Sequence, residues 1–110
     1  MAYAVADSGE VEGRFKKIRA ALGLESFGIN EVYLPPGFES YPDHDELETG
    51  HDEIFYCLSG RGSIRIDGED VELRPGRYVW VTPEAKRKLV PGDEGMTVIV
   101  VGAGGGAPKR

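Results

Sequence analysis

Residues 51–84, HDEIFYCLSGRGSIRIDGEDVELRPGRYVWVTPE, decide the fold of this chain. Short runs of β-branched and aromatic residues alternate with turns that contain glycine or proline, a spacing typical of an all-β sandwich or barrel. Asp67 and Gly68 are the pair that a tight hairpin prefers, because glycine accepts a positive φ and aspartate tolerates one. We expect strands in this stretch over residues 54–58, 63–67, 70–73 and 78–82.

The same pattern extends in both directions. It predicts further strands over residues 29–34, 87–90 and 96–101, separated by proline and glycine turns. Before them, we expect one short N-terminal helix. Its signals are Asp7 as the cap, apolar residues at helical spacing, and Gly23 as a left-handed stop. We therefore divide the chain into an N-terminal segment with a helix (1–28), a β-barrel (29–102) and a flexible tail (103–110).

Composition narrows the classes of function. A length of 110 residues with 40% hydrophobic content fits one domain with a small core. The net charge of -6 argues against nucleic acid as a partner. With no signal-peptide pattern and no long apolar run, we expect a cytoplasmic protein that does not bind membranes. The single cysteine, Cys57, lies in an apolar strand pattern and is expected to be a buried, inert thiol.

The candidate site lies in residues 35–62, which hold seven carboxylates and both histidines. If a strand begins at Glu53, alternation places Glu53, Phe55 and Cys57 on one face, and His51 shares that face. His44 and Glu46 point the same way if their segment is extended. Imidazoles and carboxylates together suit iron, manganese, nickel or zinc. On composition alone the segment is more typical of a solvated acidic loop, whose excess of Asp and Glu merely keeps the protein soluble.

The stretch PPGFESYPDHDE followed by residues 51–84 resembles the cupin superfamily, whose small single-domain members are jelly-roll barrels, also called double-stranded β-helices. The resemblance covers roughly residues 29–102. Four residues fit the places of the first cupin motif: Gly37, His44, Glu53 and Gly60. In the second motif, Gly76 opens the strand and Thr82-Pro83-Glu84 makes the turn.

Two departures from the family pattern imply a degenerate metal site. Glu46 stands where a paired histidine is usual, and the stretch from there to Glu53 is about two residues longer than usual. Where the second motif places its histidine the chain has Arg87, and a guanidinium cannot coordinate a metal. The implied metal ligands are His44, Glu46, His51 and Glu53, and a site without any metal is equally open.

Arg87 leaves three roles open. It pairs with Glu53 in a desolvated ion pair, receives a substrate carboxylate while His44 or Glu53 carries a proton, or lines an exposed rim with Lys86 and Lys88. Aromatic residues are expected either in an apolar pocket or in the core: Tyr41, Phe55, Tyr78 and Trp80.

Two classes of function follow from the resemblance. One is a small-molecule-binding cupin, with a possible enzymatic action on a small organic acid or carbonyl compound and His44, Glu53 and Arg87 as catalytic candidates. The other is a non-catalytic, metal-free ligand-binding or structural cupin. Because small jelly rolls have edge strands that need covering, we also expect a homodimer.

Overall fold

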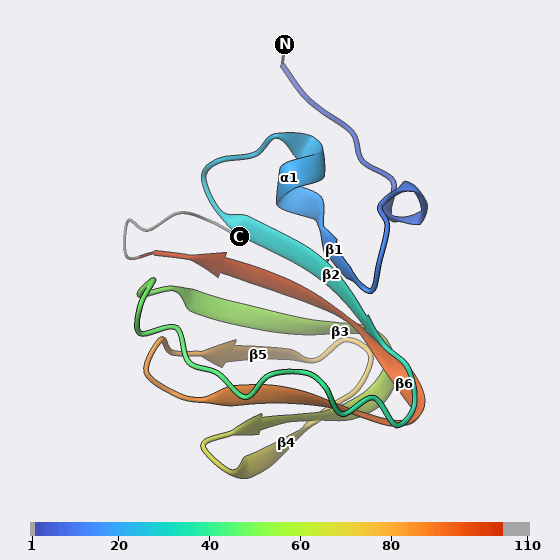
Figure 1. The fold of residues 1–110 in the computed structure, drawn as a ribbon, viewed down its shortest axis with the longest axis vertical. Helices are drawn as coiled ribbons and strands as arrows, with labels where there is room; N and C mark the ends of the chain where they lie inside the picture. Colours follow the sequence, from blue (N-terminus) through green and yellow to red (C-terminus); the bar gives the residue numbers. More distant parts are fainter. Residues whose placement is uncertain (1, 105–110) are drawn as a thin grey trace.

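The computed structural model describes residues 2–104, which form an antiparallel β structure with one short helix (Figure 1). The elements are, in chain order, a 3-10 turn η1 (Ser8–Glu10), β1 (Phe15–Lys17), α1 (Ile18–Leu22), β2 (Gly28–Leu34), β3 (Asp52–Ile66), β4 (Glu69–Leu73), β5 (Tyr78–Val81) and β6 (Arg87–Ala103). Within the described residues the strand order is β1-β2-β6-β3-β4, and β5 pairs with β3 beside this path. The predicted all-β class is confirmed.

The two long strands β3 and β6 build both halves of the fold. The first half of β3 pairs with β5 and with the end of β6, whereas its second half pairs with β4 and with the beginning of β6. The pairing shifts register near Gly60, where the sheet bends. Gly60 has a φ of 77°, and a Cβ there would lie 2.2 Å from the carbonyl oxygen of Gly95. Only glycine permits this approach of the two strands.

This bend corrects the sequence prediction. The stretches 54–58 and 63–67 were expected to be separate strands, as were 87–90 and 96–101, but each pair is one continuous strand. The glycines and prolines between them act as bulges rather than as chain reversals. The strands predicted over 29–34, 70–73 and 78–82 correspond to β2, β4 and β5.

The core lies on the inner face of the curled sheet. Its buried hydrophobic residues come from every strand from β2 to β6 and from the segment before β3. On β3 the predicted alternation is confirmed, because Glu53, Phe55 and Cys57 are buried while Ile54 and Leu58 are exposed. Glu53 is therefore held inside the barrel by the same periodicity that buries Phe55.

The N-terminal helix is much shorter than predicted. Only residues Ile18–Leu22 are α-helical, and Gly23 ends them in the left-handed conformation, as expected. Gly13 has a φ of 84°, which breaks any helix through this point. Phe15–Lys17 instead pairs with β2 as β1, and Asp7 makes no side-chain cap. Residues 15–17 therefore pair with β2 at the edge of the sheet, although the spacing of the apolar residues is that of a helix.

The barrel continues slightly beyond its predicted end. Ala103 still belongs to β6, where it pairs with Asp52. Most of the predicted tail, residues 105–110, lies outside the described residues. Within residues 2–104, no helix has the length and apolar character needed to cross a membrane.

Candidate functional site

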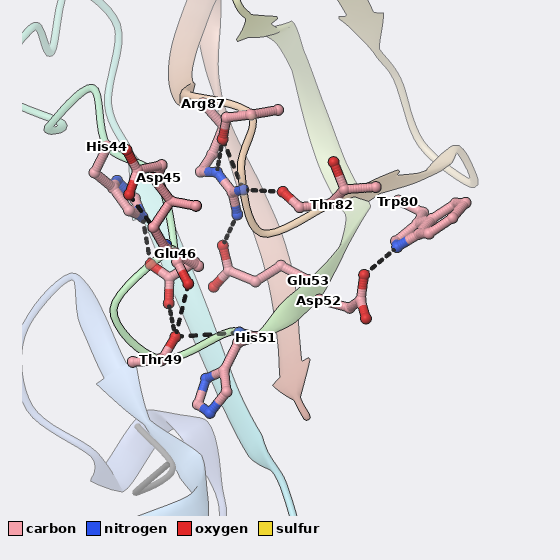
Figure 2. A network of polar contacts seen from close by, with 12 residues as sticks. His44, Asp45, Glu46, Thr49, His51, Asp52, Glu53, Trp80, Thr82 and Arg87 are labelled. Atoms are coloured by element: carbon pink, nitrogen blue, oxygen red, sulfur yellow. Dashed lines mark hydrogen bonds and ion pairs between the residues drawn. The ribbon is translucent and has the colours of Figure 1, made fainter. Parts of the chain in front are cut away.

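Three of the predicted ligands converge inside the barrel (Figure 2). His44, Glu46 and Glu53 each offer a ligand atom, and these atoms lie within 4.8 Å of one another. Glu53 comes from the beginning of β3, whereas His44 and Glu46 come from the segment between β2 and β3. The acidic segment is therefore not simply a solvated loop, because two of its members and Glu53 form one compact group.

Backbone hydrogen bonds hold the segment that carries His44 and Glu46. His44 and Arg87 form an isolated antiparallel bridge, in which the amide of His44 donates to the carbonyl of Arg87 at 3.1 Å and the reverse bond measures 2.8 Å. The amide of Glu46 donates to the carbonyl of Pro83 at 2.8 Å. The extended backbone lets side chains two residues apart point the same way. Both side chains therefore face Glu53.

The ring of His44 has a defined tautomer. Its Nδ1 lies 3.1 Å from the carbonyl oxygen of Pro42, which can only accept a hydrogen bond, so Nδ1 carries a proton. Its Nε2 is buried and makes no hydrogen bond, yet it lies 3.3 Å from Oε2 of Glu46. A lone pair that faces a carboxylate at this distance is unfavourable unless a cation balances the charge. That cation is either a proton on Nε2 or a metal ion.

Glu46 is oriented by a residue that the sequence analysis did not single out. The hydroxyl of Thr49 lies 3.1 Å from Oε1 of Glu46 and donates a hydrogen bond to it. Thr49 in turn accepts the amide of His51 at 3.2 Å. A threonine three residues after a candidate acid, in a loop, is the only signal that the sequence offers for this role.

Glu53 is paired with Arg87 in a buried ion pair. Nη1 of Arg87 donates to Oε1 of Glu53 at 2.6 Å, and the two side chains are 0% and 4% exposed. The other guanidinium nitrogens donate to backbone carbonyls of Thr82 and Ala85. Of the three roles considered for Arg87, this geometry matches the desolvated ion pair. An exposed rim position is excluded, and the nitrogens are already engaged within the chain.

His51 does not join the ligand group, although it was in the predicted metal set. It is buried and shares the face of Glu53, as expected, but its ring points away from Glu46 (Figure 2). Neighbouring positions on one face of a strand are about 6.6 Å apart, so the ring of His51 lies beyond Glu53 instead of beside it. There it lines a small cavity with Asn30 and Gly102.

A pocket of about 140 Å³ opens beside His44 and Glu53. Its other lining residues are Phe15, Asn30, Val32, Tyr41, Pro42 and Val100. Among the predicted aromatics, Tyr41 lines this pocket and Phe55 belongs to the core. Tyr78 and Trp80 do neither, because both are exposed on the outside of the sheet. Asn30, which was not among the predicted site residues, also lines the pocket, and its signal in the sequence is a polar amide in an otherwise apolar strand.

Cys57 is buried in the core, as predicted. Burial raises the pKa of its thiol, and the nearby backbone of Ser59 and charge of Arg61 offset only part of that rise. A thiol with a raised pKa holds little of the reactive thiolate at neutral pH. Cys57 is therefore suited to packing and not to nucleophilic chemistry.

A comparison with protein families finds that the model of the cupin domain matches residues 30–102. The chain belongs to the cupin family. This match covers nearly all of the jelly-roll region, from within β2 to the residue before the end of β6, and His44, Glu46 and Glu53 lie within it. No curated protein is similar enough in sequence to this cupin to count as a match.

Solved structures agree on the fold. A cupin protein from Bacteroides fragilis is 22% identical, with a TM-score of 0.78 over 100% of this chain and 91% of its own. A sugar phosphate isomerase of the cupin superfamily from Silicibacter pomeroyi is 23% identical, with a TM-score of 0.77 over 91% and 75% of the two chains. A protein from Acidithiobacillus ferrooxidans, provisionally named a sugar phosphate isomerase, is 28% identical with a TM-score of 0.65. That comparison covers 80% of this chain and 56% of the other.

Proposed function

We propose that this cupin holds a divalent metal ion between His44, Glu46 and Glu53 and binds a small organic acid or carbonyl compound beside it. One observation carries the proposal. Nε2 of His44 is buried without a hydrogen bond and faces a carboxylate of Glu46, with an atom of Glu53 also within 4.8 Å. One imidazole and two carboxylates form a mixed nitrogen and oxygen set that suits manganese, iron, nickel or zinc.

The chain's own residues prepare this group for a cation. Pro42 fixes the tautomer of His44 that leaves Nε2 facing inward, and Thr49 orients Glu46. Such hydrogen bonds from outside the ligand group are common at metal sites and strengthen binding. When bound, the ion would act as a Lewis acid and polarise a carbonyl or carboxylate oxygen of the bound small molecule.

The size and lining of the pocket support this class of ligand. Its volume of about 140 Å³ is below the roughly 300–1,000 Å³ of pockets that enclose drug-sized molecules, so a compound of a few carbons fits. Phe15, Val32 and Val100 supply apolar walls, and Asn30 supplies a polar amide. A carboxylate or carbonyl oxygen at the ion, with a short carbon chain against these walls, matches this arrangement. The 28% identity to a protein provisionally named a sugar phosphate isomerase supports action on a carbonyl compound.

Titration calorimetry with Mn²⁺ and Zn²⁺ tests the metal site. The wild-type protein is expected to bind one ion per chain, and His44→Ala and Glu46→Gln are expected to weaken binding by at least about tenfold. Asp43→Asn is the matched control, because it removes an exposed acid beside His44 but outside the ligand group. The proposal would be refuted if Asp43→Asn and Glu46→Gln lost metal affinity equally, or if the wild-type protein bound no metal. Circular dichroism checks that each variant is folded.

A metal-free binding cupin is the second candidate, and the Arg87–Glu53 ion pair favours it. With a proton on His44, the charges of Arg87 and His44 balance those of Glu46 and Glu53 without any ion. His44 would then carry a proton at the pocket wall, where a ligand carboxylate could accept it. If calorimetry detects no metal, chemical-shift changes of pocket residues on addition of small carboxylates test this second function.

A further inference from the structure

A small cavity adjoins the candidate pocket and includes His51, which the proposed function does not use. It measures about 10 Å³ and is lined by Gly28, Asn30, His51, Glu53, Val100 and Gly102. Three of these residues, Asn30, Glu53 and Val100, also line the pocket of about 140 Å³ beside His44. The two spaces are therefore neighbours, and we refer to the smaller one as the side cavity.

Two glycines leave room for the side cavity. Gly28 of β2 pairs with Gly102 of β6, which in turn pairs with Glu53 of β3. Residues that pair directly share a face of the sheet, so both glycines stand on the inner face with Glu53. Neither has a positive φ, and a Cβ on Gly102 would make only an ordinary contact of 3.5 Å with Cγ of Glu53. The backbone does not require glycine at these positions, and the absence of two side chains keeps the space open.

Two residues of the side cavity each carry a buried polar atom that lacks a partner. Oδ1 of Asn30 and Nε2 of His51 make no hydrogen bond within residues 2–104. His51 is only 1% exposed, and its ring points away from Glu46 (Figure 2). Buried polar atoms are nearly always hydrogen-bonded, because an unpaired one has lost its contact with water and gained nothing in return. A single group in the side cavity can supply the missing bond to both atoms.

The chemistry of these two atoms selects a hydroxyl oxygen. The oxygen of an amide only accepts hydrogen bonds, whereas an imidazole nitrogen donates or accepts according to its tautomer. A hydroxyl can donate to Asn30 and accept from His51 at the same time, which neither a carboxylate nor a methyl group can do. An ammonium group would add a charge that Glu53 does not balance, because Glu53 is already paired with Arg87. The cavity of about 10 Å³ has room for about one water-sized group.

We propose that Asn30 and His51 bind one hydroxyl oxygen in the side cavity, which is a water molecule in the free protein and a hydroxyl group of the ligand in the complex. The second part rests on the proposed function and narrows its ligand to a hydroxy acid or a hydroxycarbonyl compound. A ligand hydroxyl that takes over both hydrogen bonds releases the water, so it adds affinity. A site built to bond a hydroxyl discriminates against the analogue that lacks one.

A crystal structure of the protein without added ligand tests the oxygen site itself. One ordered water peak is expected, at about 2.7–3.2 Å from both Oδ1 of Asn30 and Nε2 of His51. In His51→Phe, which removes the nitrogen and keeps an aromatic ring, this peak should be lost. Well-ordered density for both wild-type side chains with no peak between them would overturn the proposal.

Titration calorimetry with matched acids tests the class of ligand. With Mn²⁺ present, at least one enantiomer of lactate should bind at least about tenfold more tightly than propionate, which has the same carbon chain without the hydroxyl. His51→Phe and Asn30→Leu should each reduce this preference to less than about threefold, because each removes one of the two hydrogen bonds. His51→Gln keeps an N–H donor and should retain more of the preference than His51→Phe. Circular dichroism checks that each variant is folded.

Two binding results would overturn the proposed class of ligand. One is an equal preference for lactate in the wild type and in His51→Phe, because the hydroxyl would then be bound elsewhere. The other is tighter binding of free alanine, in which an ammonium group replaces the hydroxyl of lactate. If neither lactate nor propionate binds, the proposed function fails and the class of ligand fails with it, whereas the water peak still decides whether the oxygen site exists.

Discussion

Replacing Arg87 with methionine should destabilise the protein severely. The methionine fills much of the arginine volume but removes the charge that compensates Glu53, whose side chain is only 4% exposed. Breaking a buried ion pair from one side costs about 3–5 kcal/mol, because the remaining charge stays buried and unpaired. The variant also loses the hydrogen bonds to the carbonyls of Thr82 and Ala85, worth about 1 kcal/mol each. We expect a total loss of at least about 4 kcal/mol, a large share of the 5–15 kcal/mol typical of a domain.

Urea denaturation followed by circular dichroism measures this loss. Lys86→Met is the matched control, because it removes an exposed neighbouring cation and should change the free energy of unfolding by less than about 0.5 kcal/mol. Adding Glu53→Gln to Arg87→Met should restore at least about 1 kcal/mol, since the orphaned charge is gone. A loss below about 1 kcal/mol in Arg87→Met, or one equal to that of Lys86→Met, would refute the account of this ion pair.

Three further predictions concern the fold and its titrating groups. Gly60→Ala should cost more than about 2 kcal/mol in urea denaturation, because a Cβ at a φ of 77° meets the carbonyl of Gly95; an unchanged midpoint would contradict this. The hydrogen bond and charge of Arg65 lower the pKa of Asp70, so their pair stabilises the fold at neutral pH and this contribution fades as the pH falls through the lowered value. Asp70→Asn should therefore lower the urea midpoint slightly at pH 7 and not well below pH 3.8, and a loss that persists in acid would contradict the assignment. Iodoacetamide should modify Cys57 only after unfolding, as mass spectrometry can follow, because burial raises the pKa of this thiol; rapid modification of the folded protein would contradict it.

The positions of the strands could be predicted from sequence, but their continuity could not. The alternation after Glu53 and the turn at Asp67-Gly68 are local signals, and they locate the strands and the hairpin. Gly60 has the same appearance in the sequence whether the chain reverses there or bends while it remains paired. The difference depends on the close approach of Gly95, which is far away along the chain. Likewise, only the pairing of Phe15 with Val32 distinguishes a strand from the predicted helix.

The candidate site likewise has features that could be predicted from the sequence and features that could not. Burial of Glu53 follows from strand periodicity, and the positions of His44 and Glu46 follow from their spacing together with the family resemblance. His51 follows the same periodicity as Glu53. Periodicity predicts which face of the strand a side chain lies on, but not whether that side chain is close enough to reach the other ligands, so the distance of His51 from the other predicted ligands could not be predicted. The role of Thr49 depends on a loop conformation that no local pattern specifies.

The most direct test of the proposed metal site is a crystal structure of the protein grown with Mn²⁺ or Zn²⁺, with anomalous scattering recorded at the metal edge. The proposed site should give one anomalous peak per chain, bonded to Nε2 of His44 and to carboxylate oxygens of Glu46 and Glu53, with metal–ligand distances of about 2.0–2.2 Å for zinc. A protein that shows no peak between these three side chains at saturating metal would contradict it.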